Sequence, residues 1–284
     1  MKIWVTGANG QLGRELRALA PMHPEHSFFF TSRGEADITD AAAVRRMVRA
    51  ERVQAIVNCA AYTQVDRAED DAEAAEAINH YGVAHLAAAA AEADALLVHI
   101  STDYVFGGKS NTPLSELDAP CPASVYGRTK LAGEEAIRAV GAPHIILRTA
   151  WLYSADGANF VNTMRRLMAE REELRVVYDQ VGSPTHAADL ADAILRILDS
   201  PRLEHCYGTY HYTNEGVCSW YDFALAIRRL CGAERCRVLP CRSADYPTKA
   251  QRPAYSVLDK SAVKSAFGLS IPHWYDSLRR CLSR

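Results

Sequence analysis

The sequence predicts an α/β fold in which a doubly wound parallel sheet is joined by a smaller, mostly C-terminal lobe. Three observations support this prediction. Short apolar runs alternate with helical segments through the first half of the chain, a glycine-rich turn follows the first run, and the alternation loosens after residue 150. Strands that alternate with helices are typical of βαβ units and a parallel sheet. A chain of 284 residues with 49% hydrophobic side chains is large enough to bury such a core.

The apolar runs and helical patterns define the expected elements in order. Strands are expected at residues 3–5, 27–30, 55–58, 96–100 and 144–147, with helices between them. After residue 151, helices are expected at 159–170, 187–198 and 221–230, separated by polar and proline-bearing loops. We therefore expect a boundary near residue 150, between a sheet domain at residues 1–150 and a smaller lobe at residues 151–284.

The first glycine-rich turn has the pattern G-x-x-G-x-x-G, formed by Gly7, Gly10 and Gly13. It follows an apolar run, and leucines recur behind it at helical spacing, so a strand, a turn and a helix are expected in that order. Such a turn lets backbone N–H groups approach a pyrophosphate at the positive end of the helix, which is the geometry of a Rossmann-like dinucleotide site. The alternative is a turn that serves helix and sheet packing alone.

Tyr126 and Lys130 stand four residues apart in a segment expected to be helical. Their Cβ atoms would lie about 5–6 Å apart on one face, so both side chains can act on one ligand. An ammonium beside a phenol stabilises the phenolate, so we expect Lys130 to lower the pKa of Tyr126. A chance pair on the surface is the alternative interpretation.

Thr102 follows the apolar run at 96–100, close to the carboxyl end of an expected buried strand. Ligands of open α/β sheets bind at that edge. A threonine hydroxyl there could hydrogen-bond a substrate oxygen while Tyr126 delivers a proton, which predicts a carbonyl reduction site.

These residues resemble the extended short-chain dehydrogenase/reductases and, within them, the dTDP-4-dehydrorhamnose reductase family. The similarity extends along nearly the whole chain. The segments that carry it are 5–13, 36–39, 58–66, 101–106, 126–134, 148–153, 179–185 and 252–259. The resemblance implies that residues 1–150 form a dinucleotide-binding domain and residues 151–284 a substrate-binding lobe. In extended reductases this lobe is discontinuous, so residues 186–203 are expected to pack back on the main sheet.

The resemblance implies NADPH-dependent reduction of the C4 keto group of dTDP-4-dehydro-6-deoxy-L-mannose to dTDP-L-rhamnose. Thr102, Tyr126 and Lys130 would be catalytic, and Thr102, Asp103 and Trp151 would contact the sugar. Nucleotide-sugar dehydratases of the superfamily have an Asp-Glu pair after the threonine, whereas Tyr104 follows Asp103 here, which argues against elimination. Open alternatives are another nucleotide-sugar 4-reductase, a 4-epimerase, or a non-catalytic protein similar to the regulatory subunit of eukaryotic methionine adenosyltransferase.

The resemblance also assigns a set of cofactor-binding residues. They are Gly7, Asn9, Gly10, Gln11, Leu12, Gly13, Ser32, Arg33, Asp37, Ile38, Ala60, Ala61, Tyr62, Thr63, Tyr126 and Lys130. Ser32 stands where an acidic residue often contacts the ribose, with Arg33 beside it, so NADPH is favoured and NADH stays open. Lys249 and Arg252 on a proline-bounded loop are candidates for binding the substrate diphosphate.

Composition limits the other classes of function. A formal net charge of -2 gives no general attraction to nucleic acid or an anionic membrane. No apolar stretch reaches the ~18–20 residues of a membrane span, and the first residues lack a signal-peptide layout, so we expect a cytoplasmic protein. The eight cysteines contain no C-x-x-C pair and are expected to be reduced.

Glu15 sits in a helix that holds a cation in some relatives, but the late acidic partner is not evident, so no metal is assigned. A homodimer is one open assembly.

Overall fold

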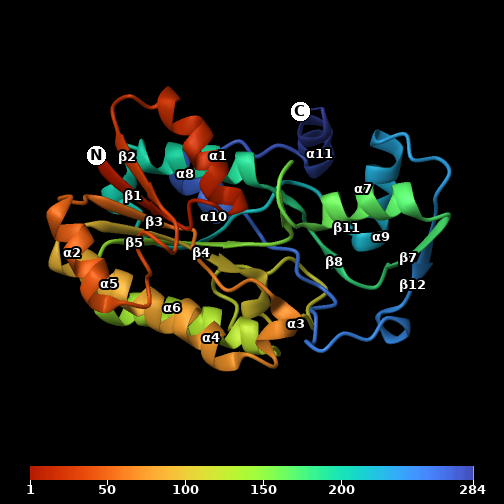
Figure 1. Ribbon diagram of the computed structural model, residues 1–284, viewed down its shortest axis with the longest axis horizontal. Coiled ribbons are helices and arrows are strands. Elements are labelled where there is room, and N and C mark those ends of the chain that lie inside the picture. Colours follow the sequence, from red (N-terminus) through yellow and green to blue (C-terminus); the bar gives the residue numbers. More distant parts are fainter. Residues whose placement is uncertain (284) are drawn as a thin grey trace.

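The computed structural model describes residues 1–283 and is built around one parallel sheet (Figure 1). In spatial order its strands are β10 (Gly208–His211), β5 (His144–Thr149), β4 (Leu96–Thr102), β3 (Ala55–Asn58), β1 (Lys2–Thr6) and β2 (Ser27–Thr31). All neighbours pair in parallel. The α/β class and the five strands expected from the sequence are confirmed. The sixth strand, β10, was not predicted, because Gly-Thr-Tyr-His contains no apolar run.

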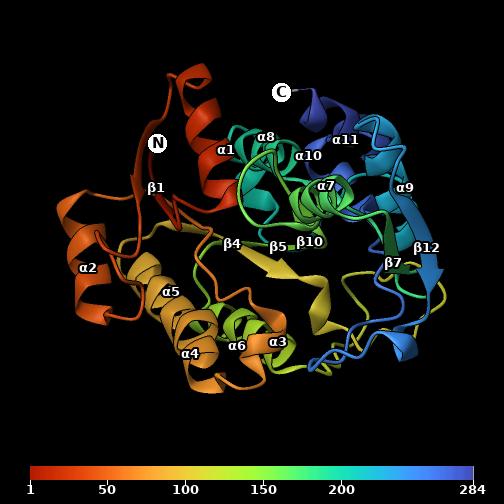
Figure 2. The same ribbon diagram turned by 45° about the vertical axis from the view of Figure 1, so that its right-hand side comes forward.

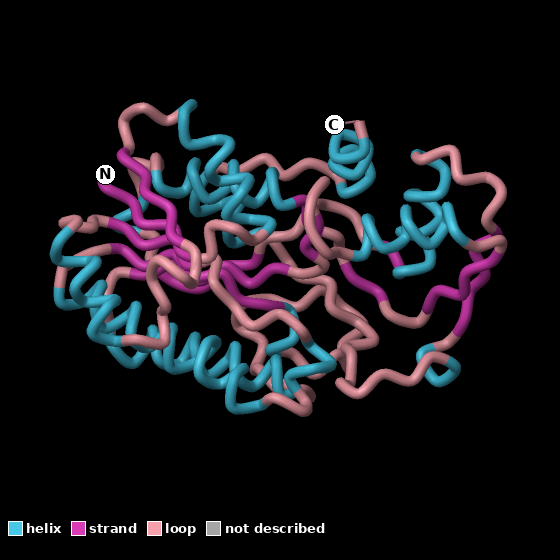
Figure 3. The backbone as a smooth tube through the Cα atoms, in the orientation of Figure 1, coloured by secondary structure: helices cyan, strands magenta, loops and turns pink. Residues whose placement is uncertain are grey.

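Helices cover both faces of the sheet, as Figure 3 shows by the strands lying between two helical layers. One layer contains α1 (Gln11–Leu19), α8 (Ala187–Leu198) and α10 (Ser261–Phe267). The other contains α2 (Ala41–Ala50), α5 (Gly82–Glu92) and α6 (Val125–Val140). The short helices α3 (Val65–Ala68), α4 (Ala72–Glu76) and the π-helical turn η2 (Ala77–Tyr81) lead into α5.

Alternation along β1 explains why both faces are covered. Ile3 and Val5 pack with Leu16 of α1, whereas Trp4 belongs to the core shared with α2 and α5. Because side chains alternate across a strand and every one of these is fully buried, β1 needs an apolar layer on each side.

A second core lies beside the carboxyl ends of the strands, in the part of the molecule that comes forward in Figure 2. It is formed by α7 (Phe160–Glu170), α9 (Trp220–Leu230), α11 (Trp274–Leu282) and the parallel pair β7 (Glu173–Val177) and β12 (Arg237–Cys241). The helices expected at 159–170, 187–198 and 221–230 agree with α7, α8 and α9 to within one residue. Smaller elements are β6 (Leu152–Tyr153), β8 (Val181–Gly182), β9 (Thr185–His186), β11 (Cys218–Ser219), η1 (Ala20–Met22), η3 (Asp103–Val105), η4 (Leu203–His205) and η5 (Ser243–Asp245).

The C-terminal half contributes to the main core at several points. Helix α8 packs against α1, and Tyr212, Val263 and Leu269 join the same apolar cluster. More of the chain beyond residue 151 therefore packs on the sheet than the segment 186–203 that the resemblance suggests. The division at residue 150 stays a prediction about binding roles.

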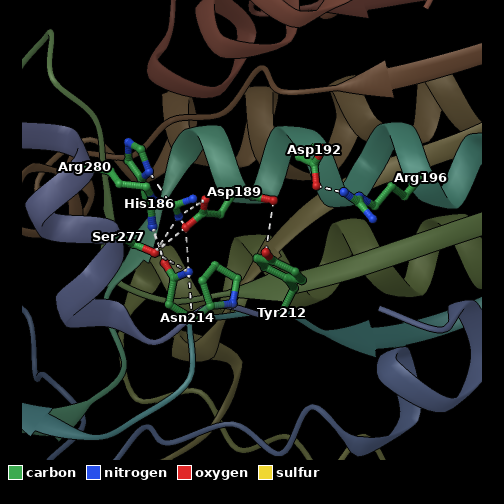
Figure 4. Close-up of polar contacts among 9 residues, drawn as sticks. His186, Asp189, Asp192, Arg196, Tyr212, Asn214, Ser277 and Arg280 are labelled. Atoms are coloured by element: carbon green, nitrogen blue, oxygen red, sulfur yellow. Dashed lines mark hydrogen bonds and ion pairs between the residues drawn. The ribbon is translucent and has the colours of Figure 1, made fainter. Parts of the chain in front are cut away.

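A buried carboxylate fastens α11 to α8. Figure 4 shows Asp189 of α8 at the centre of contacts with Asn214, Ser277 and Arg280. Burial acts to raise the pKa of Asp189, but nearby His186 and hydrogen bonds from Ser277 and Asn214 outweigh it and lower that pKa to about 2. The ionised carboxylate thus joins three segments that are distant in sequence.

No helix within residues 1–283 combines the length and the apolar character that crossing a lipid bilayer would demand.

Candidate active site

The glycine turn between β1 and α1 is held in a conformation that only small residues allow. Gly7 has φ +63°, and a Cβ there would lie 2.6 Å from the backbone nitrogen of Ala60. A Cβ on Gly13 would lie 2.6 Å from the carbonyl oxygen of Gly7. Helix α1 begins after Gly10, which supplies no side-chain cap. The first N–H groups of α1 are therefore free of a capping side chain at a site suited to a pyrophosphate.

Two adjacent cavities follow the carboxyl edge of the sheet, and Asn9, Gly10, Cys59 and Ala61 line both. The smaller, of about 510 Å³, lies over β2 and β3. It brings together many of the predicted cofactor residues, namely Gly7, Asn9, Gly10, Ser32, Arg33, Asp37, Ile38, Ala60 and Ala61. The Nε of Arg33 lies 3.1 Å from Asp37, and the guanidinium is largely exposed. Its position suits an anionic ligand group at the mouth of this cavity.

The larger cavity, of about 560 Å³, brings the predicted catalytic groups together. Thr102 of β4 and Tyr126 and Lys130 of α6 all line it, as do Asp103 and Trp151. Gln11, Leu12 and Thr63 contribute to its wall from the glycine-turn side. Proton-transfer groups from two separate elements thus face one space beside the glycine turn.

The environment of Tyr126 differs from the sequence expectation. Tyr126 is 9% exposed, and burial raises the pKa of its phenol above the ordinary value, although the hydroxyl of Thr102 acts in the opposite direction. Lys130 does not lower it, because the Nζ of Lys130 donates to the Ile100 carbonyl at 2.6 Å and lies 3.2 Å from Nε2 of His99. The expected lowering is therefore wrong for this structure. The phenol is protonated at neutral pH, which is the form that a proton donor requires.

Asp103 is the buried carboxylate of the cavity. It is 2% exposed, its Oδ1 accepts from Thr102 at 3.0 Å, and its Oδ2 has no hydrogen-bond partner among the described residues. Burial raises the pKa of Asp103 to about 6. No glutamate lies among the described residues that line the cavity. The glutamate of the dehydratase pattern is thus missing from the site as well as from the sequence.

Trp151 forms one wall of the cavity and is held in a strained position. Its φ of +50° is uncommon for a bulky residue. The indole stacks on Trp220 with ring centroids 3.6 Å apart, and a Cβ on Gly182 would lie 2.8 Å from it. Trp220, at the start of α9, also lines the cavity and was not predicted, since nothing in the sequence links it to Trp151.

Gln11 connects the glycine turn to the second core. Its Oε1 accepts hydrogen bonds from the Ser154 hydroxyl and from the Asn159 amide, each at 2.9 Å. Both donors lie in the segment between β6 and α7, which also contributes to the cavity wall.

Gly13 packs within the turn and lines neither cavity. Three other predicted residues, Tyr62, Lys249 and Arg252, also lie outside the two cavities. Tyr62 is directed away, with its hydroxyl donating to Asp71. Lys249 pairs with Asp70, and Arg252 pairs with Asp66. Arg252 also donates to the hydroxyl of Tyr104, a cavity-lining residue, at 3.0 Å. The diphosphate role of Lys249 and Arg252 therefore stays a prediction.

Buried polar residues behind the cavity were missed by sequence reasoning. Asn79, in the π-helical turn, accepts from the Tyr62 N–H and donates to the Tyr62 carbonyl, which fixes the loop after β3. Asn58 and His99 lie under Lys130, and Glu134 lies one helical turn beyond it. Polar residues inside apolar runs were the available signal for Asn58 and His99.

A glycine turn opening onto the first N–H groups of α1, beside a threonine, a tyrosine and a lysine in one cavity, places the protein among Rossmann-fold oxidoreductases of the short-chain type. Comparison of the whole chain gives the particular family. The chain belongs to the family described as RmlD substrate binding domain, whose profile matches residues 1–284.

Relatives and solved structures agree with this assignment. The chain is 41% identical to the dTDP-4-dehydrorhamnose reductase of Burkholderia thailandensis over 99% of this chain and 98% of the relative. A crystal structure of a dTDP-4-dehydrorhamnose reductase from Clostridium acetobutylicum superposes with a TM-score of 0.95 at 43% identity, covering 100% of this chain and 99% of that one. The reductase from Bacillus anthracis, solved in complex with NADP, gives 0.94 at 38% identity, covering 99% and 98%.

Proposed function

We propose that the protein reduces the C4 keto group of dTDP-4-dehydro-6-deoxy-L-mannose with NADPH and thereby forms dTDP-L-rhamnose. The observation that carries this proposal is the convergence of Thr102, Tyr126 and Lys130 on one cavity beside the glycine turn. The relatives named dTDP-4-dehydrorhamnose reductase support the choice of substrate.

The residues present fit a dinucleotide. The turn at Gly7, Gly10 and Gly13 leaves backbone N–H groups open for the pyrophosphate, and the cavity at Ser32 and Arg33 suits the adenosine end with its 2′-phosphate. Thr63, Tyr126 and Lys130 would hold the nicotinamide end. When bound, the reduced nicotinamide supplies the hydride.

Side chains of the protein would stabilise the charge that develops on the carbonyl oxygen and supply the proton that neutralises it. The Thr102 hydroxyl, which donates to Asp103 in this structure, would turn to donate to the carbonyl oxygen, on which negative charge develops during reduction. The Tyr126 phenol donates the proton to that oxygen. Trp151 and Trp220 would exclude water from one side of the cavity, and buried Asp103 would contact a sugar hydroxyl.

The activity is tested by incubating the purified protein with NADPH and a panel of nucleotide-linked 4-keto-6-deoxy sugars, then determining the product configuration at C4. We expect dTDP-L-rhamnose from the dTDP-4-dehydro-6-deoxy-L-mannose substrate. A protein that purifies with stoichiometric bound nicotinamide and interconverts C4 epimers would instead be an epimerase.

Replacing Gly13 by alanine is expected to weaken NADPH binding at least about tenfold, or about 1.4 kcal/mol. The new Cβ would lie 2.6 Å and 2.7 Å from backbone atoms of Gly7 and Ala8, so the turn must move. Fluorescence titration with NADPH measures the affinity, and thermal unfolding reports whether the fold is retained. Unchanged affinity in a folded variant would remove the turn from the cofactor site.

Replacing Arg33 by alanine is expected to reduce the preference for NADPH over NADH about tenfold, since a charge-assisted hydrogen bond is worth about 1.5–3 kcal/mol. The preference is the ratio of kcat/KM for the two cofactors. Arg46→Ala, an exposed arginine on α2, is the matched control and should leave the ratio unchanged. An unaltered ratio in the Arg33 variant would contradict the proposed phosphate contact.

We further propose a cytoplasmic location, because NADPH and nucleotide sugars are available there and the eight cysteines, all within residues 1–283, form no disulfide. The homodimer expected from the sequence stays a prediction, which light scattering in solution tests. Neither nucleic acid nor a membrane is proposed as a partner.

A further inference from the structure

Three neighbouring strands carry polar side chains in one row beneath the active-site helix α6. Thr6 of β1 pairs in register with Asn58 of β3, and Asn58 pairs with His99 of β4. All three are at most 1% exposed. Because buried polar groups are satisfied by hydrogen bonds, the donors and acceptors along this row can be assigned one by one.

The Asn58 amide has only one consistent orientation. Its Oδ1 accepts from the Thr6 hydroxyl at 2.7 Å and from the backbone N–H of Ala60 at 3.1 Å. The amide nitrogen therefore faces Nδ1 of His99, at 3.0 Å. An amide nitrogen only donates, so Nδ1 of His99 must accept.

This assignment fixes the hydrogen of the His99 ring. A ring whose Nδ1 accepts cannot carry both hydrogens, and burial lowers the pKa of His99 well below its ordinary value, so the ring is neutral and carries one N–H. With Nδ1 accepting, that hydrogen is on Nε2, which lies 3.2 Å from Nζ of Lys130. An ammonium group has no lone pair to accept it, whereas a neutral amine has one.

We propose that His99, fixed by Asn58 as the Nε2–H tautomer, is a positioning residue that holds the Lys130 side chain and favours its neutral amine form. The amine accepts from His99 and donates to the Ile100 carbonyl, so the row from Thr6 to Lys130 is complete. Only the consequence for turnover rests on the proposed reductase function.

Other titratable groups around Lys130 also affect its protonation. Burial lowers the pKa of Lys130 to about 8, while Glu134 of the same helix opposes this change. Tyr126 and Asp103 share the cavity wall with Lys130, and burial raises the pKa of each of them. Both are thus shifted toward their neutral forms. Lys130 then exchanges its proton within the working pH range of an enzyme.

The tautomer is measured directly by ¹⁵N NMR of the histidine rings in the protein without added ligand. The His99 signals are assigned by their loss in His99→Gln. We expect the pattern of a neutral ring protonated at Nε2. A ring protonated at Nδ1, or a charged ring at pH 7, would overturn the proposal.

Two variants test the effect on Lys130. In His99→Gln, the amide oxygen can accept from Asn58 and from an ammonium group. In Asn58→Asp, a carboxylate can only accept, so the imidazole hydrogen moves to Nδ1 and Nε2 accepts from Lys130. Both changes favour the ammonium form, and we expect the pKa of Lys130 to rise by at least about one pH unit, a tenfold change in proton affinity.

NMR titration of isotope-labelled lysine measures this pKa. The chain has six lysines, and Lys130→Arg assigns the relevant signal. His144→Gln, a histidine at the start of β5, is the matched control and should leave the titration unchanged. An unchanged Lys130 pKa in both variants would refute the proposal. If one variant fails to fold, the other variant and the wild-type tautomer still decide it.

The pH profile of kcat connects the titration to turnover. We expect this profile to inflect where Lys130 titrates, and that inflection should move upward in both variants by the same amount as the Lys130 titration, a shift that a loss of packing alone would not produce. If the protein reduces no 4-keto sugar, the proposed function fails while the two NMR measurements still test His99. The two failures are therefore distinguishable.

Discussion

Replacing Tyr126 by phenylalanine is expected to lower kcat by about 10²–10⁴-fold, the range that a positioned general acid contributes. The phenol is buried beside Thr102, and its raised pKa keeps the proton available for transfer to the substrate oxygen. Phenylalanine retains the ring that packs edge-on against Tyr104, with centroids 5.5 Å apart, so the cavity wall should be preserved. Stopped-flow reduction with saturating NADPH and sugar measures the loss.

The affinity for NADPH separates loss of the acid from loss of the site. Fluorescence titration should give dissociation constants for wild type and Tyr126→Phe that agree within about threefold, under 1 kcal/mol. Tyr207→Phe removes a hydroxyl from an exposed tyrosine and should leave kcat unchanged. A Tyr126 variant that turns over within tenfold of wild type would disprove the acid role.

Replacing Glu134 by glutamine is expected to destabilise the protein by about 3–5 kcal/mol, the usual effect of removing one partner of a buried ion pair. Glu134 is fully buried, and its carboxylate accepts from Nε and Nη2 of Arg148 at 2.9 and 2.7 Å and from Ser101 at 2.6 Å. The guanidinium of Arg148 would be left buried without its counter-charge. Urea unfolding followed by circular dichroism measures the free energy.

The pH dependence of stability provides a second readout. Burial acts to raise the pKa of Glu134, but Arg148, Ser101 and Arg138 outweigh it and hold that pKa below the ordinary 4.5. The ion pair therefore stabilises fully above pH 4.5 and loses its effect as pH falls through the lower, folded-state value. The difference in the free energy of unfolding between wild type and Glu134→Gln should therefore decrease as the pH falls through that acid range.

The neighbouring Glu135 supplies the matched control, since it is exposed on the same helix. Glu135→Gln should change the free energy of unfolding by less than about 0.5 kcal/mol. Equal effects at positions 134 and 135 would show that the buried pair contributes nothing specific.

Features carried by local patterns were predictable from the sequence. The glycine turn, the Tyr126–Lys130 pair and the apolar strands each depend on residues close in the chain, and each occurs where expected. The edge strand β10 was missed because its pairing with β5, rather than its own composition, defines it.

Features that depend on distant partners could not be predicted. Lys130 was expected to lower the pKa of Tyr126, but burial raises that pKa, and the Nζ of Lys130 contacts His99 and the Ile100 carbonyl. Lys249 and Arg252 were candidates for binding the diphosphate. In the structure each pairs with an aspartate that is distant in sequence, with separations of 179 and 186 residues. Side-chain pairing across the fold, and not the local motif, sets the electrostatics of the site.

Gln11, at the start of α1, joins the glycine turn to the segment between β6 and α7. Because Gln11 accepts from Ser154 and Asn159, we expect a nucleotide bound at the turn to affect sugar binding beside the segment that follows β6. By reciprocity, the sugar should then change the affinity for the nucleotide by the same factor. Asn159→Ala should bring that factor closer to one.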